Sequence, residues 1–294
     1  TINITLQPAN GTVVFDPLTG EFNYDPNPGF SGTDVFIYYV CVEGVPGSCD
    51  MVIATVTTSA GMFIPVQMQA YLEGAFDPNT GFMRTTLKTN NLLPINQPYN
   101  TAPWQYEGAE AYRNTAEIPD NSVDYVLVEA RSAANPDIVL ETRAGMLAAN
   151  GTINGFYPAN IIWGNSLPRM KFYNLEAGQS YYFVLRHRNH IDVMTATPVT
   201  IPSSSSINFT VPAQVMGGVG QLKLLSNGTY ALPGGDFNAN GVMTVADFNV
   251  FTTQSGGVNQ YVRSDCTLDG NVTVHDFNIF MSNASRIGVP FIRY

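Results

Sequence analysis

The residues best suited to chemistry are oxygen-bearing side chains in two matching segments near the end of the chain. Residues 236–247 read DFNANGVMTVAD (loop 1), and residues 265–276 read DCTLDGNVTVHD (loop 2). Both place Asp, Asn or Thr at positions 1, 3 and 5, glycine at position 6 and aspartate at position 12. Ca²⁺ is a hard cation that takes roughly six to eight oxygen ligands, which a loop with this spacing can supply. The absence of Cys and His from the ligand positions argues against zinc.

The spacing is that of an EF-hand-type loop, which binds through side chains at positions 1, 3, 5, 9 and 12 and the carbonyl at position 7. The predicted ligands of loop 1 are Asp236, Asn238, Asn240, Val242, Thr244 and Asp247. Those of loop 2 are Asp265, Thr267, Asp269, Asn271, Thr273 and Asp276. One such segment is common in ordinary turns, but its repetition in register argues against chance. We therefore predict two Ca²⁺ sites, of which loop 2 is the tighter because it carries more carboxylates.

The residues after each loop predict a short helix. The tails read FNVF and FNIF, so Phe248 and Phe251 lie three apart on one helical face, as do Phe277 and Phe280. We expect these rings to form a shared core between the two helices.

The paired segments resemble a dockerin module, in which two loop–helix repeats with Asp at position 12 pack about a pseudo-twofold axis. The resemblance covers residues 231–288 and implies docking onto a cohesin-like receptor. The chain departs from cellulosomal dockerins at Asn240 and Thr267, where Asp and Asn are usual, and in the aromatic residues after each loop.

The composition predicts a β-rich extracellular protein. Hydrophobic residues make up 45% and charged residues 12% of the 294 residues, with 26 Gly and 19 Pro. A net charge of −10 offers no basic stripe for nucleic acid. We find no apolar run of membrane-spanning length. Because the chain begins at Thr1 without a methionine, we expect a processed product or a fragment.

Residues 1–60 alternate short β-type runs with turns. The stretch NGTVVFDPLTGEFNYDPNPGFSGTDVFIYYV resembles the Ig-like and cadherin-like tandem repeats of large bacterial surface proteins. Such repeats usually have further strands upstream, so the resemblance implies an incomplete sandwich with an open edge beside residues 1–15. Ile2, Ile4 and Leu6 are expected on its inner face. A strand from a neighbouring repeat or another copy could fill the gap.

Cysteine spacing predicts one disulfide. Cys41 and Cys49 flank the turn VEGVPGS between two β-type runs, which places them on adjacent antiparallel strands in an oxidising compartment. Cys266, at position 2 of loop 2, is expected to point outward as a free thiol.

Residues 61–230 carry about nine short β-type runs spaced by turn signals, which is typical of a β-sandwich. Together with the loops they resemble a domain near the C-termini of long secreted proteins from Bacteroidota-type bacteria. The predicted fold is mainly β: Ig-like β-sandwich segments followed by a small α-helical dockerin-like module. The predicted domains are residues 1–60, 61–230 and 231–294.

The other chemically suggestive residues favour structural roles. His187 and His190, with Asp192, could bind a metal, but residues three apart on a strand face opposite sides, so a structural pair is favoured. Trp104 and Trp163 could form a sugar-stacking platform, but a core or loop-anchoring role is the favoured interpretation. We predict that the protein is not an enzyme.

Three functional hypotheses follow from these patterns. The first is a secreted, non-catalytic, calcium-stabilised structural module of a cell-surface fibre, adhesin or filament. The second is a docking module that tethers the β domains to a cohesin-like receptor. The third is a carbohydrate-binding domain.

Overall fold

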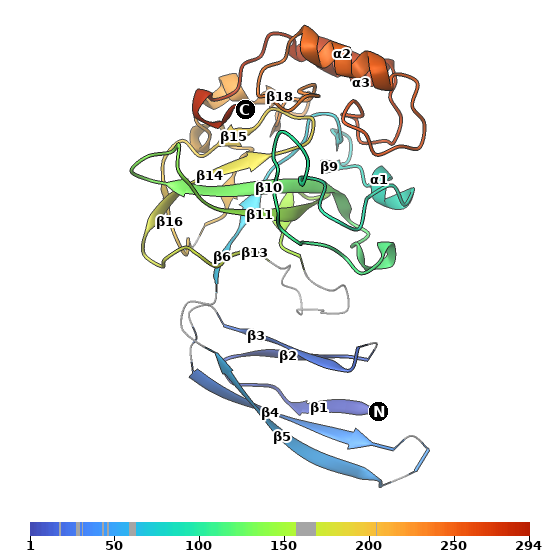
Figure 1. Ribbon diagram of the computed structural model, residues 1–294, viewed down its shortest axis with the longest axis vertical. Helices are drawn as coiled ribbons and strands as arrows, with labels where there is room; N and C mark the ends of the chain where they lie inside the picture. Colours follow the sequence, from blue (N-terminus) through green and yellow to red (C-terminus); the bar gives the residue numbers. More distant parts are fainter. Residues whose placement is uncertain are drawn as a thin grey trace. The chain divides into compact units, whose positions relative to one another are not determined.

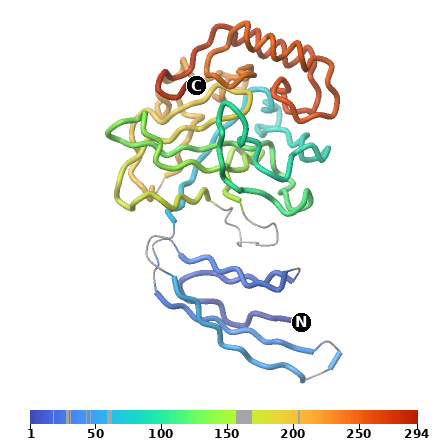
Figure 2. The backbone as a smooth tube through the Cα atoms, viewed as in Figure 1, coloured from blue at the N-terminus to red at the C-terminus, as the bar shows by residue number. Residues whose placement is uncertain are grey.

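The computed structural model describes residues 1–294 except 18, 28–29, 31, 43, 46, 59–62, 157–168 and 204. The described residues fall into two compact units, one within residues 1–64 and one within residues 65–294 (Figures 1 and 2). The prediction of a mainly β fold is confirmed, because strands far outnumber helices among the described elements.

The described residues of the first unit form five strands. They are β1 (Ile2–Leu6), β2 (Gly11–Asp16), β3 (Glu21–Pro26), β4 (Gly32–Cys41) and β5 (Cys49–Thr58). β4 lies between β1 and β5 in an antiparallel sheet, and β2 pairs with β3 in a hairpin. Phe22 contacts the rings of Phe15, Phe36 and Tyr38, so hairpin and sheet share an aromatic core.

Strand β1 differs from the expected alternation at its end. Ile2 and Ile4 are half-buried as predicted, but Leu6 is 51% exposed. The register shifts between Ile4 and Leu6, so that Ile4 pairs with Tyr38 and Leu6 with Ile37. This irregularity places Leu6 on the opposite face from Ile2 and Ile4.

The second unit is built on an eight-stranded sheet. Its order is β15-β14-β10-β11-β12-β7-β17, with β16 also paired to β14. These strands are β7 (Met68–Gln69), β10 (Ser122–Ser132), β11 (Val139–Ala148), β12 (Thr152–Asn154), β14 (Ser180–Arg186), β15 (Val193–Met194), β16 (Val199–Thr200) and β17 (Ile207–Asn208). β10 is buried over nearly its whole length, which places it at the centre of the core.

Shorter elements surround this sheet. The strands are β6 (Ile64–Val66), β8 (Phe76–Asp77), β9 (Phe82–Met83), β13 (Met170–Phe172), β18 (Lys223–Leu224) and β19 (Tyr230–Ala231). The α-helices are α1 (Thr86–Thr89), α2 (Val245–Gln254) and α3 (Val274–Asn283), and 3-10 turns cover Thr115–Glu117, Pro212–Gln214, Gly218–Gln221 and Pro290–Ile292. The run GFMRTTLKT forms the two-residue β9 followed by α1 rather than one continuous strand. None of the described helices is long and apolar enough to cross a membrane.

Helices α2 and α3 pack through phenylalanine rings, as the sequence predicts. The ring of Phe277 lies 6.0 Å from that of Phe248 and 5.5 Å from that of Phe251. Phe237, from loop 1, lies between Phe251 and Phe280, with centroid distances of 6.2 and 5.8 Å.

Residues 231–294, predicted as a separate module, belong to the same compact unit as the eight-stranded sheet. Loop 2 lies so close to the segment after β7 that a Cβ atom on Gly74 would fall 1.9 Å from the carbonyl oxygen of Cys266. The expectation that Cys266 points outward is therefore wrong: its side chain is fully buried. The inner surface of residues 231–294 therefore packs against the rest of the second unit and does not face solvent.

Candidate functional site

The two loops have the same backbone conformation. At position 4, Ala239 and Leu268 both have positive φ angles, of 57° and 56°. At position 6, Gly241 and Gly270 have φ angles of 79° and 86°, which favour glycine. The sequence repeat is thus a structural repeat, with the sharp turn at the expected residue.

The position-1 carboxylates are held by amides of their own loops. Asp236 accepts hydrogen bonds from the backbone N–H groups of Asn240 and Gly241, at 3.1 and 2.8 Å. Asp265 accepts the equivalent bonds at 3.2 and 2.9 Å. In both loops the first residue is therefore fixed against the turn at positions 5 and 6.

The position-12 carboxylates close the loops and cap the helices. Asp247 accepts from the N–H groups of Asn238 (3.1 Å) and Thr244 (2.8 Å). Asp276 accepts from those of Thr267 (2.9 Å) and Thr273 (2.8 Å). Each aspartate forms a capping box with the position-9 threonine at the start of α2 or α3.

The remaining predicted ligands make matching turns. The Oδ1 atoms of Asn240 and Asp269 each accept from the N–H two residues later, that of Val242 or Asn271, at 2.8 Å. In loop 2, the Thr267 hydroxyl lies 3.1 Å from Asp265 Oδ1 and 3.0 Å from Asp276 Oδ1. This hydroxyl joins the first and last carboxylates of the loop.

The carboxylates at positions 1 and 12 are removed from solvent. Asp236, Asp247, Asp265 and Asp276 are each at most 1% exposed. Burial, with the charges of Asp192 and Asp247, raises the pKa of Asp236 to about 8. Burial likewise raises the pKa of Asp265 to about 6, against the opposing charge of Arg188. Burial therefore shifts Asp236 of loop 1 and Asp265 of loop 2 toward their neutral forms.

The donor chemistry of the loops fits a hard cation. Among the described residues, no three His, Cys, Asp or Glu side chains gather as a metal-ligand group, so Asp269 does not join Asp265 and Asp276 in one. The oxygens available in the loops also include amides, hydroxyls and backbone carbonyls, which Ca²⁺ accepts as ligands.

The predicted histidine geometry is wrong, although the two side chains do form a structural pair. Strand β14 ends at Arg186, so the strand alternation does not extend to His187 and His190. Their Nδ1 atoms lie 3.0 Å apart, both rings are fully buried, and burial lowers both pKa values. Asp192 joins neither ring and instead pairs with Arg186.

The arginine network around these histidines was not predicted from the sequence. Buried Arg186 pairs with Glu129 and Asp192, and Arg188 Nε lies 2.7 Å from Asp124 Oδ2. The next residue, Asn189, donates to the carbonyls of Arg263 (2.9 Å) and Asp265 (2.7 Å) in and beside loop 2. The polar run RHRNHID indicated that several charged side chains need partners, but those partners are remote in sequence.

The structure does not support a sugar-stacking platform at Trp104. Its side chain is 9% exposed, packs edge-on against Tyr99 with ring centroids 5.0 Å apart, and lies under the Arg263 guanidinium. Trp163 lies outside the described residues.

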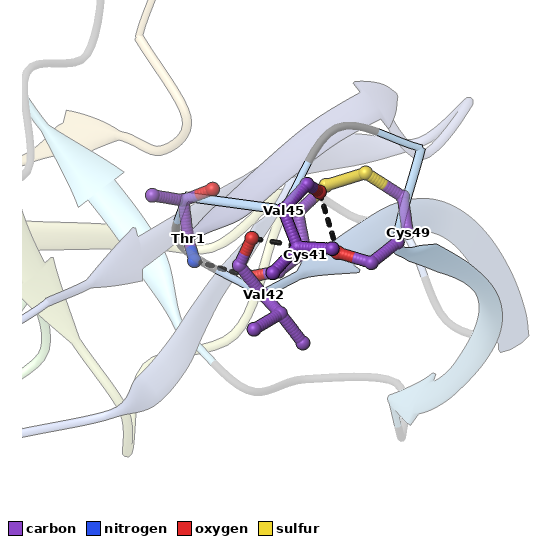
Figure 3. Close-up of a disulfide and its surroundings, with 6 residues drawn as sticks. Thr1, Cys41, Val42, Val45 and Cys49 are labelled. Atoms are coloured by element: carbon purple, nitrogen blue, oxygen red, sulfur yellow. Dashed lines mark hydrogen bonds between the residues drawn. A yellow bond between two sulfur atoms is a disulfide. The ribbon is translucent and has the colours of Figure 1, made fainter.

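The first unit carries the disulfide. Cys41 and Cys49 are paired residues of β4 and β5, and their Sγ atoms lie 2.06 Å apart (Figure 3). Thr1 lies at the same end of the sheet, where its amino group donates to the Cys41 carbonyl at 2.7 Å.

The first unit is the part of the chain that a known family matches. Residues 1–59 match the family described as a bacterial Ig domain. Searches of curated proteins and of solved structures find no match to the chain. The bacterial Ig domain indicates an extracellular structural or adhesive role for this part of the protein.

The bacterial Ig domain exposes an apolar sheet face. Met51 and Ile53 of β5 are 55% and 61% exposed, and they pair with Tyr39 and Ile37 of β4 on the same face. Val35 extends this face and is 41% exposed. Among the described strands β5 pairs only with β4, so its outer backbone edge is open.

Proposed function

We propose that this chain is a secreted, non-catalytic structural module of a bacterial cell-surface fibre, adhesin or filament, stabilised by two Ca²⁺ ions. The observation that carries the proposal is the matched geometry of the two loops, in a chain whose first 59 residues match a bacterial Ig domain. The proposal agrees with the resemblance of residues 61–230 and the loops to a C-terminal domain of secreted proteins from Bacteroidota-type bacteria.

The calcium part of the proposal rests on charge. Asp236 and Asp247 are the first and last residues of loop 1, and both carboxylates accept from backbone N–H groups of that loop. Among the described contacts, neither carboxylate is bonded to a cationic side chain. Bound Ca²⁺ would supply the missing positive charge and take oxygens from the twelve predicted ligands. Their side chains and carbonyls would need only local adjustment, because the backbone already makes the loop turns.

Calcium affinity should rise with pH. The raised pKa of Asp236, about 8, means that its carboxyl holds a proton at pH 6 that Ca²⁺ must displace. Loop 1 should therefore bind up to about tenfold more tightly for each pH unit gained, up to about pH 8. The increase for loop 2 should end nearer pH 6, where Asp265 titrates. Calorimetric Ca²⁺ titrations at several pH values measure both.

Asp236→Asn is the control for that titration. The amide keeps an oxygen in place but has no proton to lose, so most of the pH dependence of loop 1 should disappear along with part of its affinity. Burial also raises the pKa of Asp247, so a smaller pH dependence should remain. A wild-type affinity that is independent of pH would contradict the assignment of the loop-1 site.

The assembly part of the proposal rests on strand β5. This edge strand is ten residues long and carries only one charged side chain, Asp50, with no Lys or Pro to block pairing. Such edges template the addition of another strand unless they are protected. We propose that a neighbouring repeat or another copy of the chain pairs there, with the face around Ile53 covered at the same contact. The sequence predicted strand addition at the edge beside residues 1–15. We place it at β5 instead, because β5 is twice as long as β1 and so offers more backbone groups for pairing.

An association measurement tests this assembly. The calcium-loaded protein should form higher oligomers or fibres as its concentration rises, seen by sedimentation velocity and electron microscopy. Ile53→Lys should suppress association while leaving the melting temperature nearly unchanged, because the site is exposed. Val139→Lys, at an exposed site of the second unit, is the matched control and should still associate. A wild-type protein that stays monomeric at high concentration would refute self-assembly through β5.

The helix pair supports a second candidate function. Val245 and Val274 occupy equivalent positions at the starts of α2 and α3 and are 71% and 63% exposed. An exposed, twofold-related apolar pair suits a cohesin-like receptor. In that case the Ile53→Lys variant would keep its receptor binding, which separates docking from assembly.

A further inference from the structure

The side chains of Lys223, Glu73 and Asn283 meet where helix α3 packs against the rest of the second unit. Lys223 Nζ, on β18, lies 3.4 Å from Glu73 Oε1 and 3.3 Å from Asn283 Oδ1. Asn283 Nδ2 donates to Glu73 Oε2 at 2.5 Å. The carboxylate thus touches both the nucleophilic nitrogen and the nitrogen that an attack on Asn283 would release.

The surroundings hold this arrangement in place. Asn283, the last residue of α3, is 1% exposed, and its second Nδ2 hydrogen bonds the Gly234 carbonyl at 2.9 Å. The Gly234 N–H donates to Glu73 Oε2 at 3.1 Å. The side chains of Lys223 and Glu73 are 24% and 10% exposed, so little water separates the three groups. Holding reactants at contact distance supplies much of what an intramolecular reaction needs.

We propose that Lys223 and Asn283 form an intramolecular isopeptide bond, with Glu73 as the proton-transfer group. Glu73 takes a proton from the Lys223 ammonium, and the neutral Nζ moves from Oδ1 to the face of Cγ and attacks it. A C–N bond forms and the carbonyl electrons move to Oδ1. Protonated Glu73 gives its proton to Nδ2, the Cγ–Nδ2 bond breaks, and ammonia leaves.

The proton balance closes without a further reactant. The attacking nitrogen loses its extra proton to Glu73, which passes it to the departing ammonia as ammonium. The net reaction converts one ammonium side chain and one carboxamide into a secondary amide and an ammonium ion. No oxidant, metal or external nucleophile takes part, and the protein loses one positive charge.

The cross-link would enclose both calcium loops. Residues 223 and 283 are 60 positions apart, and residues 236–276 lie between them. Closing such a loop reduces the conformational entropy of the unfolded chain. The bond would therefore hold the helix pair on the β domain even where Ca²⁺ is scarce.

Mass spectrometry of the full, disulfide-reduced chain tests the proposal. The wild-type mass should be lower than the sequence mass by one ammonia, and trypsin should release a branched peptide joining Lys223 and Asn283. Lys223→Arg and Glu73→Gln should each restore the full mass and abolish the branched peptide. Lys88→Arg is the control, because Lys88 pairs with the exposed Asp120 at 3.9 Å and has no part in the reaction; it should keep the cross-link.

The branched peptide decides the result, since cyclisation of an Asn elsewhere also releases ammonia. Folded wild-type protein with its full mass and normal cleavage after Lys223 would overturn the proposal. A branched peptide that persists in a folded Glu73→Gln variant would overturn the role of Glu73. The wild-type measurement needs no variant to fold.

Discussion

Removing Ca²⁺ with a chelator should lower the melting temperature of the whole second unit, not that of the helix pair alone. The loops are fastened to the sheet: Asn189 bonds the carbonyls of Arg263 and Asp265, and Gly235 N donates to the Asn189 carbonyl at 2.9 Å. At an ion concentration about 1,000 times the dissociation constant, each site contributes about 4 kcal/mol to the free energy of unfolding. Two such sites are a large share of the stability of an ordinary domain.

Scanning calorimetry with and without chelator measures this effect, and hydrogen exchange locates it. Amides of β10 and β14 should lose protection together with those of α2 and α3. The bacterial Ig domain provides an internal control, because its transition should not move. Asp247→Ala and Asp276→Ala should each remove part of the calcium effect, and Asp276→Ala the larger part. Unchanged protection in β10 on chelation would show that the loops fold independently of the sheet.

Arg186→Met should destabilise the second unit by about 3–5 kcal/mol, the usual cost of stripping one partner from a buried ion pair. The Arg186 side chain is 2% exposed, and it pairs with Glu129 and Asp192, which are 5% and 3% exposed. Methionine fills most of the volume of the arginine but removes the positive charge that pairs with the buried carboxylates of Glu129 and Asp192. Urea denaturation of the calcium-loaded protein measures the loss.

Arg143→Met is the matched comparison. Arg143 also pairs with a buried glutamate, Glu141, but the Arg143 side chain is 31% exposed and Glu141 also accepts from the N–H groups of Tyr173 and Asn174. The same substitution should therefore cost less than Arg186→Met, because the Glu141 carboxylate keeps two backbone donors. Replacing Glu129 by Gln in the Arg186→Met background should recover part of the loss. Equal costs at the two arginines would show that the buried network contributes no more than the partly exposed Arg143–Glu141 pair.

Local patterns were sufficient for features that depend on neighbouring residues. The five strands of the first unit follow from alternating apolar residues and turn signals. The loop turns follow from Gly241 and Gly270, whose positive φ is set within a few residues. The phenylalanine spacing after each loop likewise indicated the shared core of α2 and α3.

Features that depend on distant partners were not predictable in this way. Cys266 is buried in a core cluster that includes Ile191 and Phe237, from segments outside loop 2, and nothing within loop 2 indicates those contacts. The histidine geometry failed because β14 ends at Arg186, where side-chain ion pairs replace the strand ladder. The Glu73, Lys223 and Asn283 contacts also join residues that no local pattern links.

The strand directions in the first unit determine how it would carry mechanical load. Ile2 of β1 pairs with Val40 and therefore lies at the Cys41 end of β4, whereas Thr58 of β5 pairs with Gly32 at the other end. Tension between Thr1 and Thr58 would pull β1 and β5 in opposite directions along β4. Antiparallel hydrogen bonds run across the strands, so such a force shears all of them at once instead of opening them one by one. A domain loaded in this way resists extension better than one whose hydrogen bonds open one by one.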